Sequence, residues 1–421
     1  MRILWFNWRD LKNPDAGGAE VFTHEVMTRL AKMGYEITLF CPLFPNAARK
    51  EKIDGIEIIR SGGVFTVYLK AKQFYKRNKD RYDLVIDEIN GKPFLSPKIV
   101  GNKPVLVLFH QMIRDIWFHE THFPLNCLCY YYLEKKWLSA YKNIPAVTVS
   151  ASSKRDLKEH GFNKVSIVTV GVGTTPLVKV GQKELEPTIV FLGRLKRHKL
   201  PDHALRAFAL IKNELPHAKM WVIGAGNMHE ELKMMNIKDV VFYGHINDDL
   251  KYELLRKAHL LFVPSVREGW GLVVTEANAM GTPAIAYDAP GLRDSIVDGK
   301  TGILIKHKSP KNLASSALTL LRNPDLLKMF SVSALAFSKQ FSWDNTAAEF
   351  DKIITQLVPH VEIELEKAIE ELKKSEQDIE ELKKSEEEEA VSKGVGPLLI
   401  NTKKDHTLKE LAKKENVSNT W

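Results

Sequence analysis

The order of hydrophobic and polar positions predicts strands separated by helices. In the first part of the chain, short apolar runs are continuous rather than alternating, which is typical of parallel strands buried on both faces. A helix is expected after the first run, because apolar residues recur there at helical spacing and Gly34 can end it; they are Phe22, Val26, Leu30 and Met33. The runs expected to form strands are residues 2–6, 36–40, 83–87, 105–109, 146–149 and 165–170.

A second series of the same kind follows a loose stretch at 173–187 that contains proline and glycine. Its expected strands are 188–192, 220–223, 240–243, 260–263 and 284–287, and its expected helices are 202–215, 228–235, 248–258 and 272–280. Open parallel sheets bind their ligands at the carboxyl ends of the strands. The pattern therefore predicts an α/β chain with two Rossmann-like domains and a ligand site in the cleft between them.

The end of the chain has a different pattern. Residues 369–376 and 379–386 repeat one charged octet with a period of ten, which matches no regular supercoil. Apolar spacing at Leu365, Ile369, Leu372 and Ile379 suggests heptads, but Glu376 and Lys383 then fall at core positions. We expect a charged helical repeat with a flexible tail over 358–421, which either stays solvated or associates with itself.

The composition of the 421 residues narrows the class of protein. Hydrophobic residues make up 44% and charged residues 27%, which excludes collagen-like, largely disordered and disulfide-scaffold proteins. No apolar run reaches the roughly 18 residues of a spanning helix, and the apolar start is too short for a signal peptide. Three cysteines cannot form a disulfide framework. We expect a cytoplasmic protein, either free or peripheral on the cytoplasmic face of the membrane.

The net charge of +9 is unevenly distributed. The residues from Pro359 onward carry eleven Lys or Arg and sixteen Asp or Glu, which leaves a net charge of +14 on the rest. A basic body favours anionic partners such as a nucleotide, a phosphate or an anionic lipid, although a merely soluble basic surface has the same charge. The cations cluster where the cleft is predicted and no nucleic-acid-binding motif occurs, so no nucleic-acid partner is expected.

The strongest chemical signal is the segment that runs from Glu268 to Glu276. It follows the expected strand 260–263, passes through Gly269 and Gly271, and enters a helix that starts near Leu272. Such a strand–glycine loop–helix unit points the backbone N–H groups of Leu272 and Val273, with the positive end of the helix dipole, at one spot that suits a phosphate. The two glutamates can then accept hydroxyl protons from a sugar and a ribose.

A second signal lies directly after the strand 188–192, where Gly193 and Arg194 begin a basic stretch that ends at Lys199. Arginine donates in a fork that fits phosphate and lysine acts as a point charge, so the stretch can clamp an anion. The alternative is a basic, solvated loop.

Two features of the first domain point to the same cleft. Gly17 and Gly18 lie between its first strand and first helix, where the backbone can approach a phosphate, although a simple turn also uses this pair. His110 follows the strand 105–109 at its carboxyl end. No closely spaced set of His, Cys and carboxylate residues predicts a metal site.

Residues 3 to about 357 resemble glycosyltransferase family 4, the retaining, metal-independent enzymes of GT-B architecture. The pair Glu268 and Glu276 matches its E-x7-E motif, Arg194 and Lys199 its diphosphate-binding cations, Gly17-Gly18 its glycine loop, and His110 its active-site histidine. One departure is Leu200, which follows Lys199 where the family often has glycine.

The resemblance implies an acceptor-side domain at 1–172, a nucleotide-sugar-binding domain at 173–341, a crossover helix at 342–357 and the tail at 358–421. It implies transfer of a hexose, with retention, from a UDP- or GDP-linked donor to a glycan or lipid-linked acceptor, with no cofactor besides the donor. Arg194, Lys199, Glu268 and His110 would be the catalytic residues. The donor would be held by Gly17, Gly18, Gly193, Gly269, Gly271, Leu272, Val273 and Glu276. The alternatives are a GT-B epimerase or phosphorylase, or a non-catalytic subunit of a glycosyltransferase complex.

Two segments of the first domain bear on the acceptor. Residues 67–77 mix cations with aromatics, and residues 112–137 contain seven aromatic residues of which three are consecutive tyrosines. Basic and aromatic stretches of this kind suit an anionic membrane surface. The alternative is an aromatic domain core beneath a solvated basic face.

Overall fold

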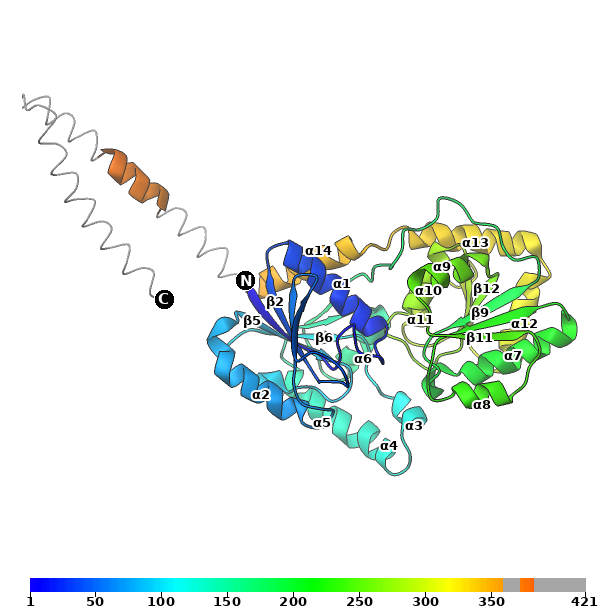
Figure 1. Ribbon diagram of the computed structural model, residues 1–421, viewed down its shortest axis with the longest axis horizontal. Helices are drawn as coiled ribbons and strands as arrows, with labels where there is room; N and C mark the ends of the chain where they lie inside the picture. Colours follow the sequence, from blue (N-terminus) through cyan, green and yellow to red (C-terminus); the bar gives the residue numbers. More distant parts are fainter. Residues whose placement is uncertain (359–371, 382–421) are drawn as a thin grey trace, which may run out of the picture. The chain divides into compact units, whose positions relative to one another are not determined.

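The computed structural model describes residues 1–358 and 372–381, and its body contains two sheets flanked by helices (Figure 1). The first sheet has the strand order β3-β4-β2-β1-β5-β6-β7-β8. All its neighbouring strands pair in parallel except β3 and β4. Its strands are β1 (Arg2–Phe6), β2 (Glu36–Cys41), β3 (Lys50–Ile53), β4 (Ile56–Arg60), β5 (Leu84–Ile89), β6 (Val105–Phe109), β7 (Ala146–Thr148) and β8 (Val165–Ile167).

Helices cover both faces of this sheet. They are α1 (Gly18–Lys32), α2 (Val67–Asn78), α3 (Ile116–Glu120), α4 (Leu125–Leu128), α5 (Glu134–Leu138) and α6 (Ala151–Glu159). The central strands β1 and β6 are buried along almost their whole length, because their continuous apolar sequences meet helices on each side. The tyrosine-rich part of 112–137 forms a short helical stretch between α4 and α5.

The second sheet is parallel throughout, in the order β11-β10-β9-β12-β13-β14. Its strands are β9 (Thr188–Leu192), β10 (Lys219–Ile223), β11 (Val240–Gly244), β12 (Leu260–Val263), β13 (Ala284–Tyr287) and β14 (Gly302–Ile305). The helices around it are α7 (Pro201–Glu214), α8 (His229–Met234), α9 (Asp248–Lys257), α10 (Leu272–Ala279), α11 (Leu292–Ser295), α12 (Pro310–Leu321) and α13 (Pro324–Ser338). The predicted fold class, two Rossmann-like α/β domains, is confirmed.

The last helix of the body, α14 (Trp343–Leu357), returns to the first domain and packs beside α1 (Figure 1). Phe350 of α14 stacks on Trp5 with ring centroids 5.5 Å apart. The chain thus crosses between the domains twice, and the two crossings touch. A Cβ on Gly171 would lie 2.4 Å from the Trp343 ring, so only glycine fits there.

Three strands were not predicted: β3, β4 and β14. Lys50–Ile53 is charged and pairs only at the sheet edge, antiparallel to β4, so it carries no buried apolar pattern. β14 lies at the other sheet's edge and begins at Gly302 directly after a turn, and its two middle residues are only half-buried. In the separate unit that begins at Val358, residues 372–381 are helical and expose Leu372 and Ile379. The rest of the predicted repeat and tail lies outside the described residues. No described helix is long and apolar enough to cross a membrane.

Candidate active site

A cavity lies between the two domains where the chain leaves the carboxyl ends of β1, β6, β9 and β12. The strand order reverses between β1 and β5 in the first sheet and between β9 and β12 in the second, and open α/β sheets bind ligands at such points. The structure brings most of the predicted site residues to this cavity: Gly17, Gly18, His110, Arg194, Lys199, Glu268, Gly269, Gly271 and Leu272 all line it. Gly193, Val273 and Glu276 do not line it.

The glycine loop of the first domain touches the second domain. Gly17 is the N-cap of α1, and its amide donates to the Glu20 carboxylate at 2.7 Å. A Cβ on Gly18 would lie 3.0 Å from Leu272 Cδ1, and one on Gly17 would lie 3.7 Å from Arg194 Nε. A side chain at Gly18 would press against Leu272, whereas one at Gly17 would make an ordinary contact, so the close approach of the two walls is at Gly18.

Arg194 follows β9 by two residues and reaches the cavity after Gly193, whose φ of +153° is one that side chains rarely adopt. Among residues 1–358 and 372–381, the structure gives the Arg194 guanidinium no hydrogen bond or ion pair. Its planar set of N–H donors therefore remains available to an anion in the cavity.

Lys199 is bound to Glu268. Its Nζ lies 2.5 and 2.6 Å from the two carboxylate oxygens. Burial opposes ionisation of Glu268, but the charge and hydrogen bond of Lys199 outweigh it and lower the pKa of that carboxyl. Lys199 is followed by Leu200 at φ +50°, a left-handed conformation that costs roughly 1–2 kcal/mol for a residue with a side chain.

The helix α10 begins as predicted at Leu272, with Gly271 as N-cap at φ +94°. The first amides of a helix have no partner within it, so the Leu272 amide is available at the cavity wall. Glu276 lies one turn further on and outside the cavity. Its Oε1 accepts from Lys251 Nζ at 2.9 Å and from the Tyr252 hydroxyl at 3.2 Å.

His110 is held by a residue that the sequence analysis missed. Its Nε2 lies 3.0 Å from Glu88 Oε1, and Glu88 is buried at the end of β5. The other oxygen of Glu88 accepts from Trp5 Nε1 at 2.9 Å and from Thr23 Oγ1 at 2.7 Å. This fully bonded carboxylate fixes the histidine ring. A signal for Glu88 existed, because two carboxylates interrupt an otherwise apolar strand.

Among the unpredicted residues that line the cavity, three have titratable side chains: Arg9, Glu20 and His198. Arg9 Nη1 lies 3.7 Å from Glu20 Oε1. Burial raises the pKa of Glu20, although the Gly17 amide and Arg9 oppose that effect. His198 Nδ1 lies 2.6 Å from Glu120 Oε1 of the first domain. The cavity therefore combines several cations with only two carboxylates, each already paired.

Two facing Rossmann-like domains, a last helix that returns to the first domain and a site in the cleft define the GT-B class of glycosyltransferases. A family model described as Glycosyltransferase Family 4 matches residues 16–175, and one described as Glycosyl transferases group 1 matches residues 177–335. The chain belongs to this family, as its motifs predicted.

Curated and solved relatives agree with this assignment. A D-inositol 3-phosphate glycosyltransferase of Thermobispora bispora is 25% identical over 393 residues, covering 82% of this chain and 91% of its own. The sucrose-phosphate synthase of Thermosynechococcus elongatus has a similar fold, with a TM-score of 0.71 at 18% identity over 85% of this chain and 99% of that one. Anabaena HepE, solved in complex with UDP-glucose, matches with a TM-score of 0.65 at 15% identity over 85% of this chain and 100% of that one.

Proposed function

We propose that this glycosyltransferase moves a hexose from a UDP- or GDP-linked donor to an acceptor hydroxyl with retention of the anomeric configuration. The observation that carries the proposal is Arg194, whose guanidinium has no partner in the part of the chain that the structure describes and lies in a cavity that also receives the start of α10. Both features attract a diphosphate. The UDP-glucose complex of HepE supports a donor of this chemistry.

The catalytic step follows from these charges. As the bond between the sugar C1 and the diphosphate oxygen breaks, charge grows on the diphosphate, where Arg194, Lys199 and the α10 amides stabilise it. The acceptor oxygen forms its bond to C1 on the same face, and its proton passes to the departing phosphate oxygen. Glu268 would hold sugar hydroxyls, and His110 would bind the sugar from the opposite wall. Glu276 lies outside the cavity, one turn along α10, so it would hold the ribose of a donor that extends past the cavity. Since these cations and dipoles supply the positive charge, transfer needs no metal ion and should survive a chelator.

The acceptor is a glycan or a lipid-linked sugar on the side of the first domain. In residues 67–77 the structure buries Tyr75 and leaves Lys70, Lys72, Lys76 and Arg77 exposed on α2. Large apolar side chains are exposed near these cations, at Phe65 and Leu69, and others are exposed on the segment 112–137, at Phe118, Phe123, Tyr131 and Tyr132. Exposed cations beside exposed apolar groups favour contact with an anionic membrane.

A thermal-shift screen of nucleotide diphosphates and nucleotide sugars tests the donor class. A ligand at 100 times its dissociation constant adds about 2.7 kcal/mol of stability. UDP or GDP and their hexose conjugates should raise the melting temperature, whereas no shift with any of them would contradict the proposal. Retention is then tested by incubating the enzyme with donor and acceptor and monitoring the anomeric NMR signals of the product. An epimerase would release epimer from donor alone, a phosphorylase would need phosphate, and a non-catalytic subunit would show no turnover.

A further inference from the structure

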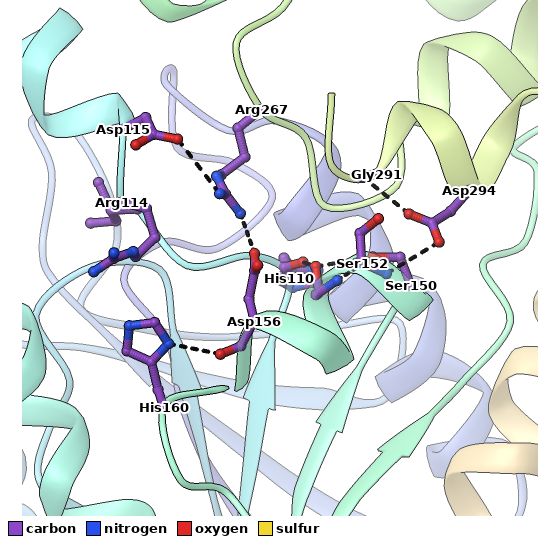
Figure 2. Close-up of polar contacts among 12 residues, drawn as sticks. His110, Arg114, Asp115, Ser150, Ser152, Asp156, His160, Arg267, Gly291 and Asp294 are labelled. Carbon is purple, nitrogen blue, oxygen red and sulfur yellow. Dashed lines mark hydrogen bonds and ion pairs between the residues drawn. The ribbon is translucent and has the colours of Figure 1, made fainter. Parts of the chain in front are cut away.

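Arg267 directly precedes Glu268 in the second domain, yet its guanidinium binds carboxylates of the first domain. It forms an ion pair with Asp156 of α6, and its Nη2 lies 3.7 Å from Asp115 Oδ2, just before α3. Figure 2 shows Arg267 reaching between these two aspartates. The residue next to a predicted catalytic glutamate is therefore fixed by the opposite wall of the cleft.

The burial of Arg267 depends on this contact between domains. Its side chain is only 9% exposed, and its Nε is buried without a hydrogen-bond partner among the residues that the structure describes. A buried, incompletely bonded charge is unfavourable, and a buried ion pair often gains little over its cost of desolvation. A contact of this kind can open and close readily, whereas an apolar contact of the same size would hold the domains together.

A second contact has the same form. His198 directly precedes Lys199, and both its ring Nδ1, at 2.6 Å, and its backbone amide, at 3.2 Å, bind Glu120 of α3. Lys199 and Glu268 bind each other, so each partner of that pair has a neighbour in the chain that is held by the first domain.

A third contact joins α11 to α6. Asp294 accepts from the Ser152 amide across the cleft and from the Gly291 amide in its own domain, both at 3.2 Å (Figure 2). Glu268 in turn donates its amide to Pro290, the residue before Gly291, at 3.0 Å. The backbone that carries Glu268 is thus tied to the first domain on both sides.

We propose that Arg267 is a positioning residue, a latch that closes the first domain on the second and so sets the geometry of the Lys199–Glu268 pair. The latch consists of Arg267 with Asp156 and Asp115, supported by His198 with Glu120. Its role in transfer rests on the function proposed above, but its role in closure does not. When the latch opens, the donor-binding elements of the second domain stay intact, but the first domain, which carries the acceptor side, moves away from them.

The test compares Arg267→Ala and Asp156→Asn with the matched control Arg322→Ala. Arg322 pairs with Glu214 at 2.5 Å, but both side chains are exposed and both lie in the second domain. Two amides bonded across the cleft, those of Ser152 and His198, report closure by hydrogen exchange in the full-length chain without any substrate. Both latch variants should exchange faster in the peptides that contain these amides, and Arg322→Ala should match the wild type.

Turnover and binding complete the test. In the latch variants the dissociation constant for nucleotide diphosphate should stay within about twofold, while kcat should fall on the order of 10–100-fold, as expected for reacting groups misplaced by about 1 Å. Unchanged exchange at both amides, or loss of nucleotide binding equal to the loss of kcat, would overturn the latch. If wild type transfers no sugar but the exchange difference remains, the proposed function fails and the closure role stands. The isosteric Asp156→Asn variant keeps the test valid if Arg267→Ala does not fold.

Discussion

Lys199 and Glu268 form a two-point ion pair inside the cleft, with Nζ at 2.5 and 2.6 Å from the carboxylate oxygens. The two residues were predicted for separate tasks, one on the diphosphate and one on the sugar. Since the cation is already bound by a carboxylate, it contributes less net charge to a ligand than Arg194, which has no partner among the described residues. The Lys199–Glu268 pair therefore stabilises the fold of the site as well as binding a ligand. Arg194 is the group whose charge is more fully available to an anion.

Lys199→Met should destabilise the chain through Glu268. Removing one partner of a buried pair costs about 3–5 kcal/mol, because the remaining charge is left without compensation. Lys199 lowers the pKa of Glu268, so this stabilisation is present above the ordinary carboxyl pKa of about 4.3 and is lost as pH falls through the lower, folded value. The difference in unfolding free energy between wild type and variant should be large at pH 7 and shrink in acid, as measured by urea unfolding.

The double variant Lys199→Met with Glu268→Gln is the control for this effect. It removes both charges and should recover much of the lost stability while remaining inactive. A double variant as unstable as Lys199→Met alone would contradict the assignment.

Arg194→Ala should show the opposite profile. Within residues 1–358 and 372–381 the guanidinium has no partner to lose, so the melting temperature should change little. In contrast, kcat should fall on the order of 10²–10³-fold, by analogy with a lost oxyanion donor. Arg194→Lys should also be impaired, because a point charge does not replace the fork. Steady-state kinetics with the thermal melt of each variant decide the matter. A large fall in melting temperature with unchanged turnover per folded molecule would make Arg194 a structural residue.

Glu276→Ala should weaken nucleotide binding by roughly 10–100-fold, the value of one hydrogen bond to a charged group. Wild type should prefer a ribonucleotide to its 2′- or 3′-deoxy analogue, and the variant should lose that preference in calorimetry. The control Glu253→Ala removes an exposed carboxylate that pairs with Lys257 on α9. Equal affinity of Glu276→Ala and wild type for the ribonucleotide would exclude the ribose role.

Membrane contact through α2 can be tested with matched charge removal. Replacing Lys70, Lys72, Lys76 and Arg77 by Gln should reduce co-sedimentation with anionic vesicles, most at low salt, since each cation near such a surface contributes roughly 1 kcal/mol. The control replaces four exposed lysines of the second domain, Lys233, Lys238, Lys311 and Lys328. If both variants lose vesicle binding equally, the net charge of the protein and not α2 is responsible. If the wild type does not bind vesicles, membrane contact through α2 is excluded.

A chain that ends at Leu357 should fold and turn over normally. The body through Leu357 is a compact unit by itself, and the described helical residues 372–381 are all exposed. The size of the truncated chain is measured by analytical ultracentrifugation, and its activity is measured as transfer to a soluble acceptor. A folded but inactive product would show that the residues after Leu357 take part in the chemistry.

Local signals made most of the site predictable. Gly269, Gly271 and Leu272 lie in a continuous strand–loop–helix segment whose spacing alone predicts a phosphate-facing helix start, and α10 begins where expected. Glu88 was not predictable in the same way, because its partner His110 is 22 residues away and they meet only when β5 and β6 pair. The same applies to Arg267, whose partners belong to the other domain.

The fold was predictable where burial on both faces leaves a continuous apolar run, as in β1 and β9. It was not predictable at the sheet edge, where Lys50–Ile53 keeps its charged side chains in solvent. This segment is a strand because a short turn brings it beside β4. The domain boundaries and the roles assigned to single residues remain predictions.

The contact between Gly171 and Trp343 has a mechanical consequence. The two crossings meet at this point, so the domains are joined by two segments of chain and not by one flexible linker. The second crossing also makes the first dispensable for cohesion. A protease cut within 173–187 would leave α14 anchored in the first domain by Phe350 and Ile354, which have no exposed surface. The nicked protein should elute as one particle, two polypeptides held by a helix that belongs to one of them and is embedded in the other.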